Sequence, residues 1–218
     1  MLVTFDCSGT LLDTAPVGAA LATIAGRAGV APHAADAAYS IWESRLMFGD
    51  GFLPFEDLLE EVLRRCDMDL RAGDCFSSGA ADLRRAYEQL APYPDVVPAL
   101  DRLHASGMRL GVVSNTSRPL LDAHRRALAG LIDLSACADE IRAYKPRAAV
   151  FDRVEAWRTP GERHVHVAKG YWWDVEPARR RRWPAVWINR GGLAPPETGP
   201  HPPELATLTG LPELLQDA

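Results

Sequence analysis

An α/β fold is predicted for this chain of 218 residues: a Rossmann-like, three-layer parallel sheet core that carries an inserted helical cap. Two observations predict it. In the second half of the chain, short apolar runs alternate with amphipathic helical segments, which is typical of parallel strands joined by right-handed helical crossovers. Between residues 14 and 91, by contrast, helical spacing continues with no credible strand. We therefore expect a core domain of residues 1–13 and 92–218 and a cap domain of residues 14–91.

The first strand is expected over Leu2–Phe5, an apolar run that ends at Asp6. A turn that contains Gly9 follows it. A carboxylate placed directly after a buried strand lies at the carboxyl edge of a parallel sheet, where such sheets have their ligand crevice. Taken alone, Asp6 could equally cap the next helix.

Four helices are expected in the cap, because apolar residues recur at helical spacing and Gly or Pro interrupts them. Gly29 and the sequence Gly49-Asp50-Gly51 are interruptions, and Pro54 or its neighbour opens the third helix. The expected helices cover residues 19–28, 34–47, those from 54 onward, and 78–90.

In the core, strands and helices are expected to alternate after residue 94. Residues 169–173 are expected to form an exit loop, and the proline-rich segment 191–203 another loop. A short connection at 131–141 leads to Tyr144-Lys145-Pro146. Strands are expected over 108–113, 164–168 and 185–188, and helices over 95–106, 118–129, 148–156, 175–182 and 204–215.

Composition and charge argue against several classes of protein. A net charge of −5 and a pI near 5.7 argue against nucleic-acid binding. Neither a secretory signal nor a membrane-spanning run is recognisable, so we expect a cytoplasmic protein without membrane contact. The four cysteines show no C-x-x-C spacing and are expected to be reduced. Only two of the 24 Lys and Arg residues are lysines, Lys145 and Lys169.

Polar residues follow the predicted strands at four places: Asp6, Ser114-Asn115, Lys145 and residues 169–174. The carboxyl ends of parallel strands meet at one edge of the sheet, so we expect these residues to share a crevice. Singly, each has an ordinary explanation. Ser114 and Asp174 could cap helices, and Lys145 could be a solvated charge.

The sequence Phe5-Asp6-x-x-Gly-Thr-Leu-x-Asp resembles the nucleophile motif of the haloacid dehalogenase-like hydrolases, and the other segments follow in that superfamily's order. The resemblance implies that Asp6 attacks the substrate and forms an aspartyl intermediate, which water then hydrolyses. It also implies that the helical cap closes over the substrate and excludes water.

The same resemblance implies roles for the residues around Asp6. Thr10 and Ser114, with Asn115 beside them, would orient the nucleophile and bind the transferred or departing group. Lys145 would keep Asp6 ionised by lowering its pKa. Asp174 would bind a metal, as in the superfamily's phosphatases, or position water, as in its dehalogenases.

Two positions differ from the phosphatases of the superfamily. Ser8 stands where they have a second Asp, and Ala168-Lys169 stands where they have the Gly-Asp that binds Mg²⁺. A hydroxyl is a poor general acid near pH 7, and an ammonium repels Mg²⁺. The resemblance therefore implies no metal cofactor. The alternative is a Mg²⁺-dependent phosphatase of small phosphate esters, similar to phosphoglycolate phosphatases, in which Asp6 and Asp174 would be the metal ligands.

The 2-haloacid dehalogenase branch, which works without metal, is similar at more places. Ser114-Asn115, Tyr144-Lys145-Pro146 and the run at 187–190 resemble that branch. Arg45 falls where its cap presents an arginine to a carboxylate or halide, although an ordinary surface arginine is the alternative. The resemblance implies a small anionic substrate. The expected substrate-binding residues are Ser8, Trp42, Arg45 and Tyr171.

Departures from this branch leave further hypotheses open. The chain has Ser8 and Phe151 where the dehalogenases have Tyr, and Lys169-Gly170-Tyr171 where they have Ser-Ser-Asn. We expect the Lys169 ammonium to take the place of a metal between Asp6 and Asp174, the alternative being a lysine that points to solvent. The fold could also serve as a binding or regulatory module without chemistry.

Two other features bear on relatives and partners. The superfamily's phosphonate hydrolases depend on a cap lysine, and residues 14–91 contain none, so that branch is excluded. The aromatic sequence Tyr171-Trp172-Trp173 is expected to pack against the cap or against a second copy of the chain in a homodimer.

Overall fold

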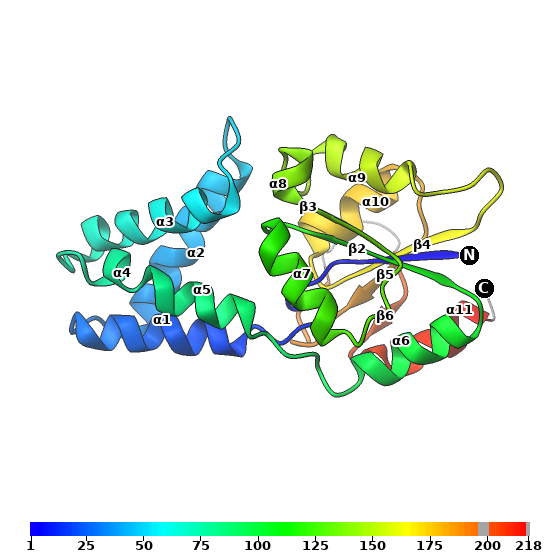
Figure 1. Cartoon of the computed structure of the whole chain (residues 1–218), viewed down its shortest axis with the longest axis horizontal. Helices are drawn as coiled ribbons and strands as arrows, with labels where there is room; N and C mark the ends of the chain where they lie inside the picture. The colour runs from blue at the N-terminus through cyan, green and yellow to red at the C-terminus, as the bar shows by residue number, and fades with distance from the viewer. Residues whose placement is uncertain (196–200, 217–218) are drawn as a thin grey trace.

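The computed structural model describes residues 1–195 and 201–216 and contains a six-stranded sheet in the order β3-β2-β1-β4-β5-β6 (Figure 1). All neighbouring strands are parallel, and β1 lies in the middle with β2 and β4 on its two sides. The predicted α/β fold with a parallel sheet is therefore confirmed. The strands are β1 Leu2–Phe5, β2 Arg109–Ser114, β3 Leu134–Cys137, β4 His164–Ala168, β5 Ala185–Ile188 and β6 Glu204–Leu205.

Helices cover both faces of this sheet, which makes three layers. Leucines of α6, α7 and α11 belong to the same buried cluster as Val3, Phe5 and Val112 on one face. On the other face, α9 and α10 pack through apolar side chains with Val113 and Ala168. The helices of these layers are α6 Val96–Ala105, α7 Arg118–Ala127, α8 Ala138–Ile141, α9 Ala148–Glu155, α10 Glu176–Arg180 and α11 Leu211–Gln216.

Five helices between β1 and α6 form a separate group beside the sheet (Figure 1). The segment that enters this group lies beside the segment that leaves it. The N–H of Asp13 in the first donates to the carbonyl of Ala91 in the second (2.9 Å). The division into a core and an inserted cap at residues 13 and 92 stays a prediction. The helices are α1 Ala15–Arg27, α2 Pro32–Phe48, α3 Phe55–Leu70, α4 Cys75–Ser78 and α5 Ala80–Glu88.

The last of the expected cap helices differs from the prediction. A single helix was expected over 78–90, but the chain forms the short α4 before α5. The carboxylate of Asp67 at the end of α3 accepts hydrogen bonds from the backbone N–H groups of Phe76 (2.8 Å) and Ser77 (2.9 Å). These bonds stabilise the first turn of α4, a contact that helical spacing alone does not reveal.

Among the core elements that were not expected from the sequence are β3, α8 and β6. The edge strand β3 has the sequence Leu-Ser-Ala-Cys, which lacks the β-branched residues that mark a strand, and α8 follows it directly. The two-residue β6 starts where a closing helix was expected, and that helix begins only at Leu211. Of the loop expected over 191–203, residues 196–200 lie outside the described residues.

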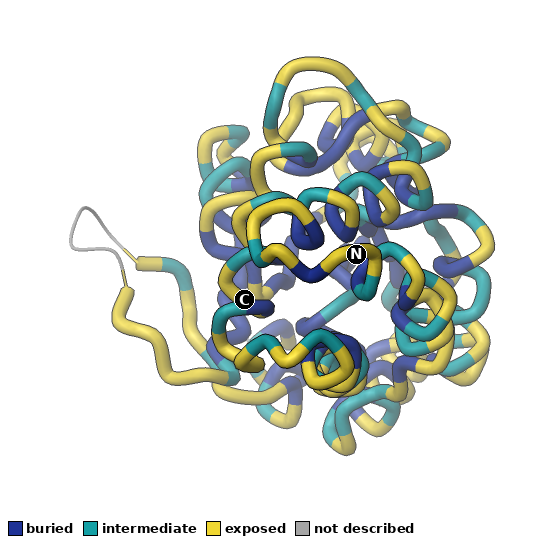
Figure 2. Tube along the Cα trace, turned by 90° about the vertical axis from the view of Figure 1, so that its left-hand side faces the viewer, coloured by how far each residue is buried: buried dark blue, intermediate teal, exposed yellow. Residues whose placement is uncertain are grey.

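Apolar burial is continuous from the sheet into the helical group. On α3, Phe55, Leu58, Leu59, Val62 and Leu63 form one buried stripe at helical spacing. Figure 2 shows exposed residues on the outside of the trace and buried ones gathered within it. No helix in the described part of the chain is long and apolar enough to cross a membrane.

Candidate active site

Asp6 lies at the carboxyl edge of the sheet, directly after the central strand β1. The neighbouring strands β2 and β4 end at Ser114 and Ala168, at the same edge, because their registers pair Phe5 with Val112 and with Val167. The Asp6 side chain lines a pocket of about 370 Å³, whose walls come from this edge of the sheet and from the helical group. Parallel sheets characteristically bind ligands at this edge.

Both oxygens of the Asp6 carboxylate accept a hydrogen bond. The hydroxyl of Thr10 donates to Oδ2 (2.6 Å), and the ammonium of Lys145 donates to Oδ1 (2.6 Å). The Thr10 hydroxyl oxygen in turn accepts the backbone N–H of Lys169 (2.8 Å), so its proton is directed at Asp6. The carboxylate is thus held in one orientation at the pocket wall.

Lys145 is a fully buried cation between two carboxylates. Its Nζ lies 2.6 Å from Asp6 Oδ1 and 2.9 Å from Asp174 Oδ1, and it also donates to the carbonyl of Val113 (3.2 Å). Burial by itself lowers the pKa of Lys145, but the charges of Asp174 and Asp6 outweigh it and hold that pKa above its ordinary value. The ammonium therefore stays charged beside Asp6.

Asn115 fixes the backbone that carries this lysine. Its side-chain oxygen accepts the N–H of Lys145 (2.7 Å), and its side-chain nitrogen donates to the Lys145 carbonyl (3.3 Å). The same nitrogen lies 3.2 Å from the sulfur of Met47 on α2. Ser8, Ser114 and Asn115 all line the pocket. That they bind a substrate stays a prediction.

Asp174 lies behind Lys145 and is not exposed at all. Burial raises the pKa of its carboxyl, but Lys145 and His166 outweigh this and lower that pKa. Because Lys145 and His166 engage its oxygens and it does not line the pocket, Asp174 is placed to hold the lysine rather than to contact a ligand.

His166 and Thr4 are site residues that sequence reasoning missed. His166 Nε2 lies 3.1 Å from Asp174 Oδ1, and His166 Nδ1 lies 2.9 Å from the Thr4 hydroxyl, which also lies 2.7 Å from His164 Nε2. Burial lowers the pKa of His164 to about 3, so that ring is neutral. The contacts of this row are consistent when His164 donates to Thr4, Thr4 to His166, and His166 to Asp174, and His164 Nδ1 is then left without a partner. The available signal was the two histidines spaced two residues apart on β4, on the same side of the strand that lies beside Thr4 of β1.

Asp174 is positioned by a single π-helical turn over Tyr171–Val175, where the sequence predicted a loop. The extra residue of such a turn often marks a functional site. Gly170 makes this turn feasible. A Cβ at that position would overlap the Trp173 indole and approach Asp174 Oδ2 to 2.8 Å.

We expect Gly170→Ala to lower the free energy of unfolding by about 1–3 kcal/mol, because the added methyl group must displace Trp173 or Asp174. Urea denaturation measures this change. Gly26→Ala in α1 is the matched control, since a Cβ there meets no atom within 4 Å beyond its chain neighbours and the backbone of its own helix, and there alanine should be neutral or stabilising. Equal stability of the two variants would contradict the proposed role of Gly170.

Lys169 does not occupy the position expected for it. The ammonium between Asp6 and Asp174 belongs to Lys145, not to Lys169. Lys169 is exposed, and its side chain extends past Gly9 at the surface. The backbone N–H of Lys169 donates to Thr10, whereas the ammonium of Lys145 is buried and donates to the carbonyl of Val113 on β2.

Trp42 and Arg45 also lie away from the pocket. Both are on α2, but the Arg45 guanidinium stacks over the Trp42 ring (5.0 Å), and Trp42 Nε1 donates to Asp69 on α3 (2.7 Å). They are absent from the pocket lining, because helical periodicity turns 39, 43 and 47 toward the pocket instead. The expectation that Arg45 faces the crevice was therefore wrong.

Tyr171 is the third expected contact that the structure places elsewhere. It is buried against Trp187 (ring centroids 5.2 Å apart), and its hydroxyl accepts a hydrogen bond from Arg179. From the same turn, Trp173 lines the pocket and stacks with Phe48 of α2, so the aromatic sequence does pack against the helical group. The homodimer stays a prediction.

The residues present do not fit a Mg²⁺ ion at Asp6 and Asp174. Across residues 1–195 and 201–216, no three His, Cys, Asp or Glu side chains gather as a metal site. The Lys145 ammonium fills the space between the two carboxylates and engages both. Mg²⁺ requires several oxygen ligands in octahedral geometry, which this arrangement does not offer.

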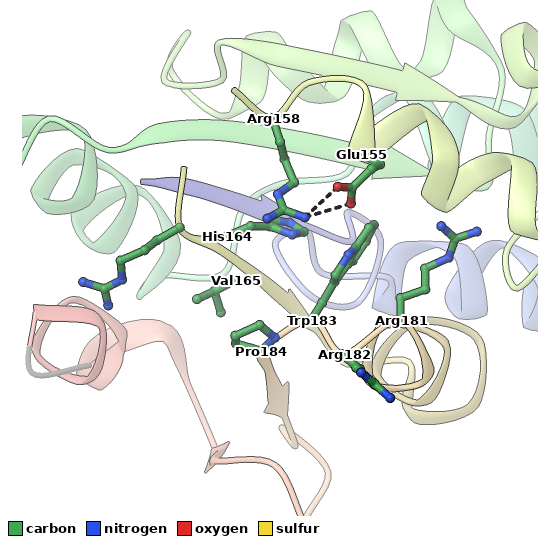
Figure 3. A pocket seen from close by; sticks show the side chains of 9 residues that line it. Glu155, Arg158, His164, Val165, Arg181, Arg182, Trp183 and Pro184 are labelled. Carbon is green, nitrogen blue, oxygen red and sulfur yellow. Dashed lines mark hydrogen bonds and ion pairs between the residues drawn. The ribbon is translucent and has the colours of Figure 1, made fainter. Parts of the chain in front are cut away.

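A larger cavity, of about 740 Å³, lies at the opposite edge of the sheet (Figure 3). His164 and Val165, at the start of β4, line it together with Trp183 and Pro184 before β5. Arg158 at its wall is already paired with Glu155 (2.7 Å). Because Asp6 and Lys145 lie at the other edge, this cavity is separate from the candidate active site.

Comparisons with known proteins find similar sequences and a similar fold. The chain matches the haloacid dehalogenase-like hydrolase family model over residues 1–180. It is 30% identical to haloacetate dehalogenase H-2 of Moraxella sp. (strain B), over 69% of this chain and 68% of that protein. It is also 30% identical to (S)-2-haloacid dehalogenase H-109 of Pseudomonas putida, over 74% and 71%. A crystal structure of an L-2-haloacid dehalogenase superposes with a TM-score of 0.85 at 25% identity, covering 99% of this chain and 98% of that one.

Proposed function

Because the chain belongs to the haloacid dehalogenase-like hydrolases, we propose that it hydrolyses the carbon–halogen bond of a small 2-halogenated carbonyl compound, with Asp6 as the covalent nucleophile. One observation carries the proposal. Asp6 faces the pocket while Thr10 and Lys145 hold its two oxygens. A carboxylate oriented in this way, with a cation beside it, is a nucleophile ready for attack.

In the first step, a carboxylate oxygen of Asp6 attacks the carbon that carries the halogen. A carbon–oxygen bond forms as the carbon–halogen bond breaks, and its electron pair leaves with the halide ion. The product is an ester of Asp6. Ser8, Ser114 and Asn115 line the space in front of Asp6, where their polar groups can receive the departing halide.

In the second step, water adds to the ester carbonyl of Asp6. The carbon–oxygen bond at that carbonyl breaks, the substrate leaves as an alcohol, and the carboxylate is restored with release of one proton. Lys145 donates to Asp6 Oδ1, so its ammonium stabilises the negative charge that develops on the carbonyl oxygen. The sum is the organic halide plus water giving the alcohol, a halide ion and a proton.

No metal is needed for either step. The Lys145 ammonium supplies the positive charge beside Asp6, and Asp174 with His166 keeps the lysine in place. The carboxylates of Asp6 and Asp174, the two residues that would hold Mg²⁺, are both engaged by the Lys145 ammonium. The phosphatase alternative, which requires that ion, is not supported by this arrangement.

The 2-haloacids named for the relatives are one subclass of the proposed substrates. A halogen next to a carbonyl group is a favourable leaving group in a displacement of this kind. The resemblance implied a small anionic substrate, and Arg45 was the residue expected to contact its charge, but Arg45 stacks on Trp42 outside the pocket. The proposal therefore concerns the bond that is broken and the nucleophile, not the charge of the substrate.

A single-turnover experiment in H₂¹⁸O tests this proposal. With enzyme in excess over 2-chloropropionate or 2-chloropropionamide, we expect one ¹⁸O atom in Asp6, detected by mass spectrometry of its peptide, because water attacks the Asp6 ester carbonyl. Turnover should be unchanged after exhaustive chelation. Label found only in the product, or activity lost in EDTA and restored by Mg²⁺, would contradict the mechanism.

A further inference from the structure

The pocket in front of Asp6 is unusually acidic for a site expected to hold an anion. Besides Asp6, the carboxylates of Asp36 and Glu43 line it, both from α2. Among the described lining residues, Lys145 is the single cation, and two carboxylates already engage it. A carboxylate ligand entering this pocket would thus meet like charges without a free positive partner.

Glu43 belongs to a hydrogen-bonded cluster in the part of the pocket wall that the helical group provides. The hydroxyl of Tyr87, on α5, lies 3.5 Å from Glu43 Oε1 and 3.1 Å from the hydroxyl of Tyr39, one turn before Glu43. Burial raises the pKa of both tyrosines well above the ordinary value, so they remain neutral hydrogen-bond donors. The cluster presents the Glu43 carboxyl to whatever fills the pocket.

The charge of Glu43 changes in the neutral pH range. Burial raises the pKa of its carboxyl to about 7, and hydrogen bonds from Tyr39 and Tyr87 only partly oppose this. Glu43 is therefore protonated below that pH and ionised above it. The lining residues from α1 and α3 carry no titratable side chain. The titratable and charged groups that face Glu43 are Asp36 and Tyr39 of α2, Tyr87 of α5, and Asp6, Tyr144 and Lys145 of the sheet layer.

We propose that Glu43 is a specificity residue that selects, among 2-halogenated carbonyl compounds, those whose carbonyl group is an uncharged amide over those that carry a free carboxylate. This inference rests on the proposed function. An amide N–H₂ group can donate to the ionised Glu43 carboxylate, whereas a carboxylate can only accept and would be repelled by it. A carboxylate substrate finds a donor there only while Glu43 is protonated.

The test compares halide release from 2-chloropropionamide and 2-chloropropionate, which have nearly the same shape. We expect the amide to have the higher kcat/KM at pH 8. The amide-to-carboxylate ratio should rise about tenfold from pH 6 to pH 8, because a like charge then appears on Glu43. Parallel reactions with the Asp6→Asn variant measure the halide that is released by uncatalysed alkylation of the protein, and this amount is subtracted from the halide released by the wild type.

Three variants separate Glu43 from general charge effects. Glu43→Gln should keep the amide-to-carboxylate ratio constant with pH. Tyr87→Phe removes a donor to the ionised form and should move the transition to higher pH. Glu60→Gln removes an exposed carboxylate of α3 outside the pocket and should behave as the wild type. A carboxylate preference at pH 8, or the same pH dependence in Glu43→Gln, would overturn the proposal.

A binding experiment keeps this inference separate from the proposed reaction. Propionamide and propionate contain no halogen, so ligand-observed NMR measures their binding without turnover. Propionamide should bind more tightly at pH 8, and the difference should disappear in Glu43→Gln. If neither 2-chloropropionamide nor 2-chloropropionate releases halide but propionamide binds more tightly than propionate, the proposed reaction is wrong and the proposed selectivity of Glu43 holds. If propionate binds as well as propionamide at pH 8, the selectivity is wrong whatever the reaction.

Discussion

Asp6→Asn should reduce halide release by about 10⁴-fold or more, since the amide is nearly isosteric with the carboxylate but is not a competent nucleophile. Losing a nucleophile removes the covalent pathway rather than weakening a single contact. The fold should persist, because Thr10 can still donate to the amide oxygen and Lys145 keeps its contact with Asp174. Initial rates of halide release measure the loss.

The control for Asp6→Asn is a check that the variant protein is folded and keeps the introduced amide. Thermal unfolding should show a melting temperature near that of the wild type, and intact-mass measurement should show that the introduced amide has not hydrolysed back to the carboxylate. Thr10→Ser is a matched second variant, because it keeps the hydroxyl that donates to Asp6 and should retain most of the activity. Substantial halide release by Asp6→Asn protein whose amide is intact would remove Asp6 from the role of nucleophile.

Lys145→Met should abolish activity and also lower the free energy of unfolding by about 3–5 kcal/mol, because it leaves the buried Asp174 carboxylate without its cationic partner. The remaining contact of Asp174, from His166, does not replace a buried ammonium. Urea denaturation at pH 7 measures the stability, and halide release measures the activity.

The double variant Lys145→Met with Asp174→Asn provides the control. Removing the second charge should recover part of the lost stability but none of the activity, because the ammonium beside Asp6 is still missing. An additive loss of stability in the double variant would show that the two residues do not act as a pair.

The sign of the pH dependence follows from the lowered pKa of Asp174. In the wild type, this carboxyl contributes stability above its unfolded pKa, and that contribution is lost as pH falls through the lower folded pKa. Without Lys145, burial favours the protonated form. The stability deficit of Lys145→Met should therefore shrink as the pH is lowered from 7 toward 5.

Local sequence patterns were sufficient where an element is marked by its own residues. The strand Leu2–Phe5 is apolar and ends at Asp6, and the turn with Thr10 lies within a few positions of it, so the hydrogen bond between Thr10 and Asp6 is a local consequence. The same holds for β2 and β4, whose apolar runs end at the sheet edge. The weakly patterned β3 was missed because its four residues carry no such mark.

The amino-acid sequence by itself determined the parallel α/β fold, the family and the convergence of Asp6, Ser114 and Lys145 on one edge of the sheet. The reason is that residue types and the alternation of strands and helices along the chain are visible in the sequence without knowledge of the packing. Which lysine lies between the carboxylates, and which face of α2 meets the pocket, were decided only by tertiary packing. Lys145 lies there because β2 and the turn at Asp174 surround it. Arg45 is turned away because α2 packs on α3 through the side that carries Trp42, leaving Glu43 to face the pocket.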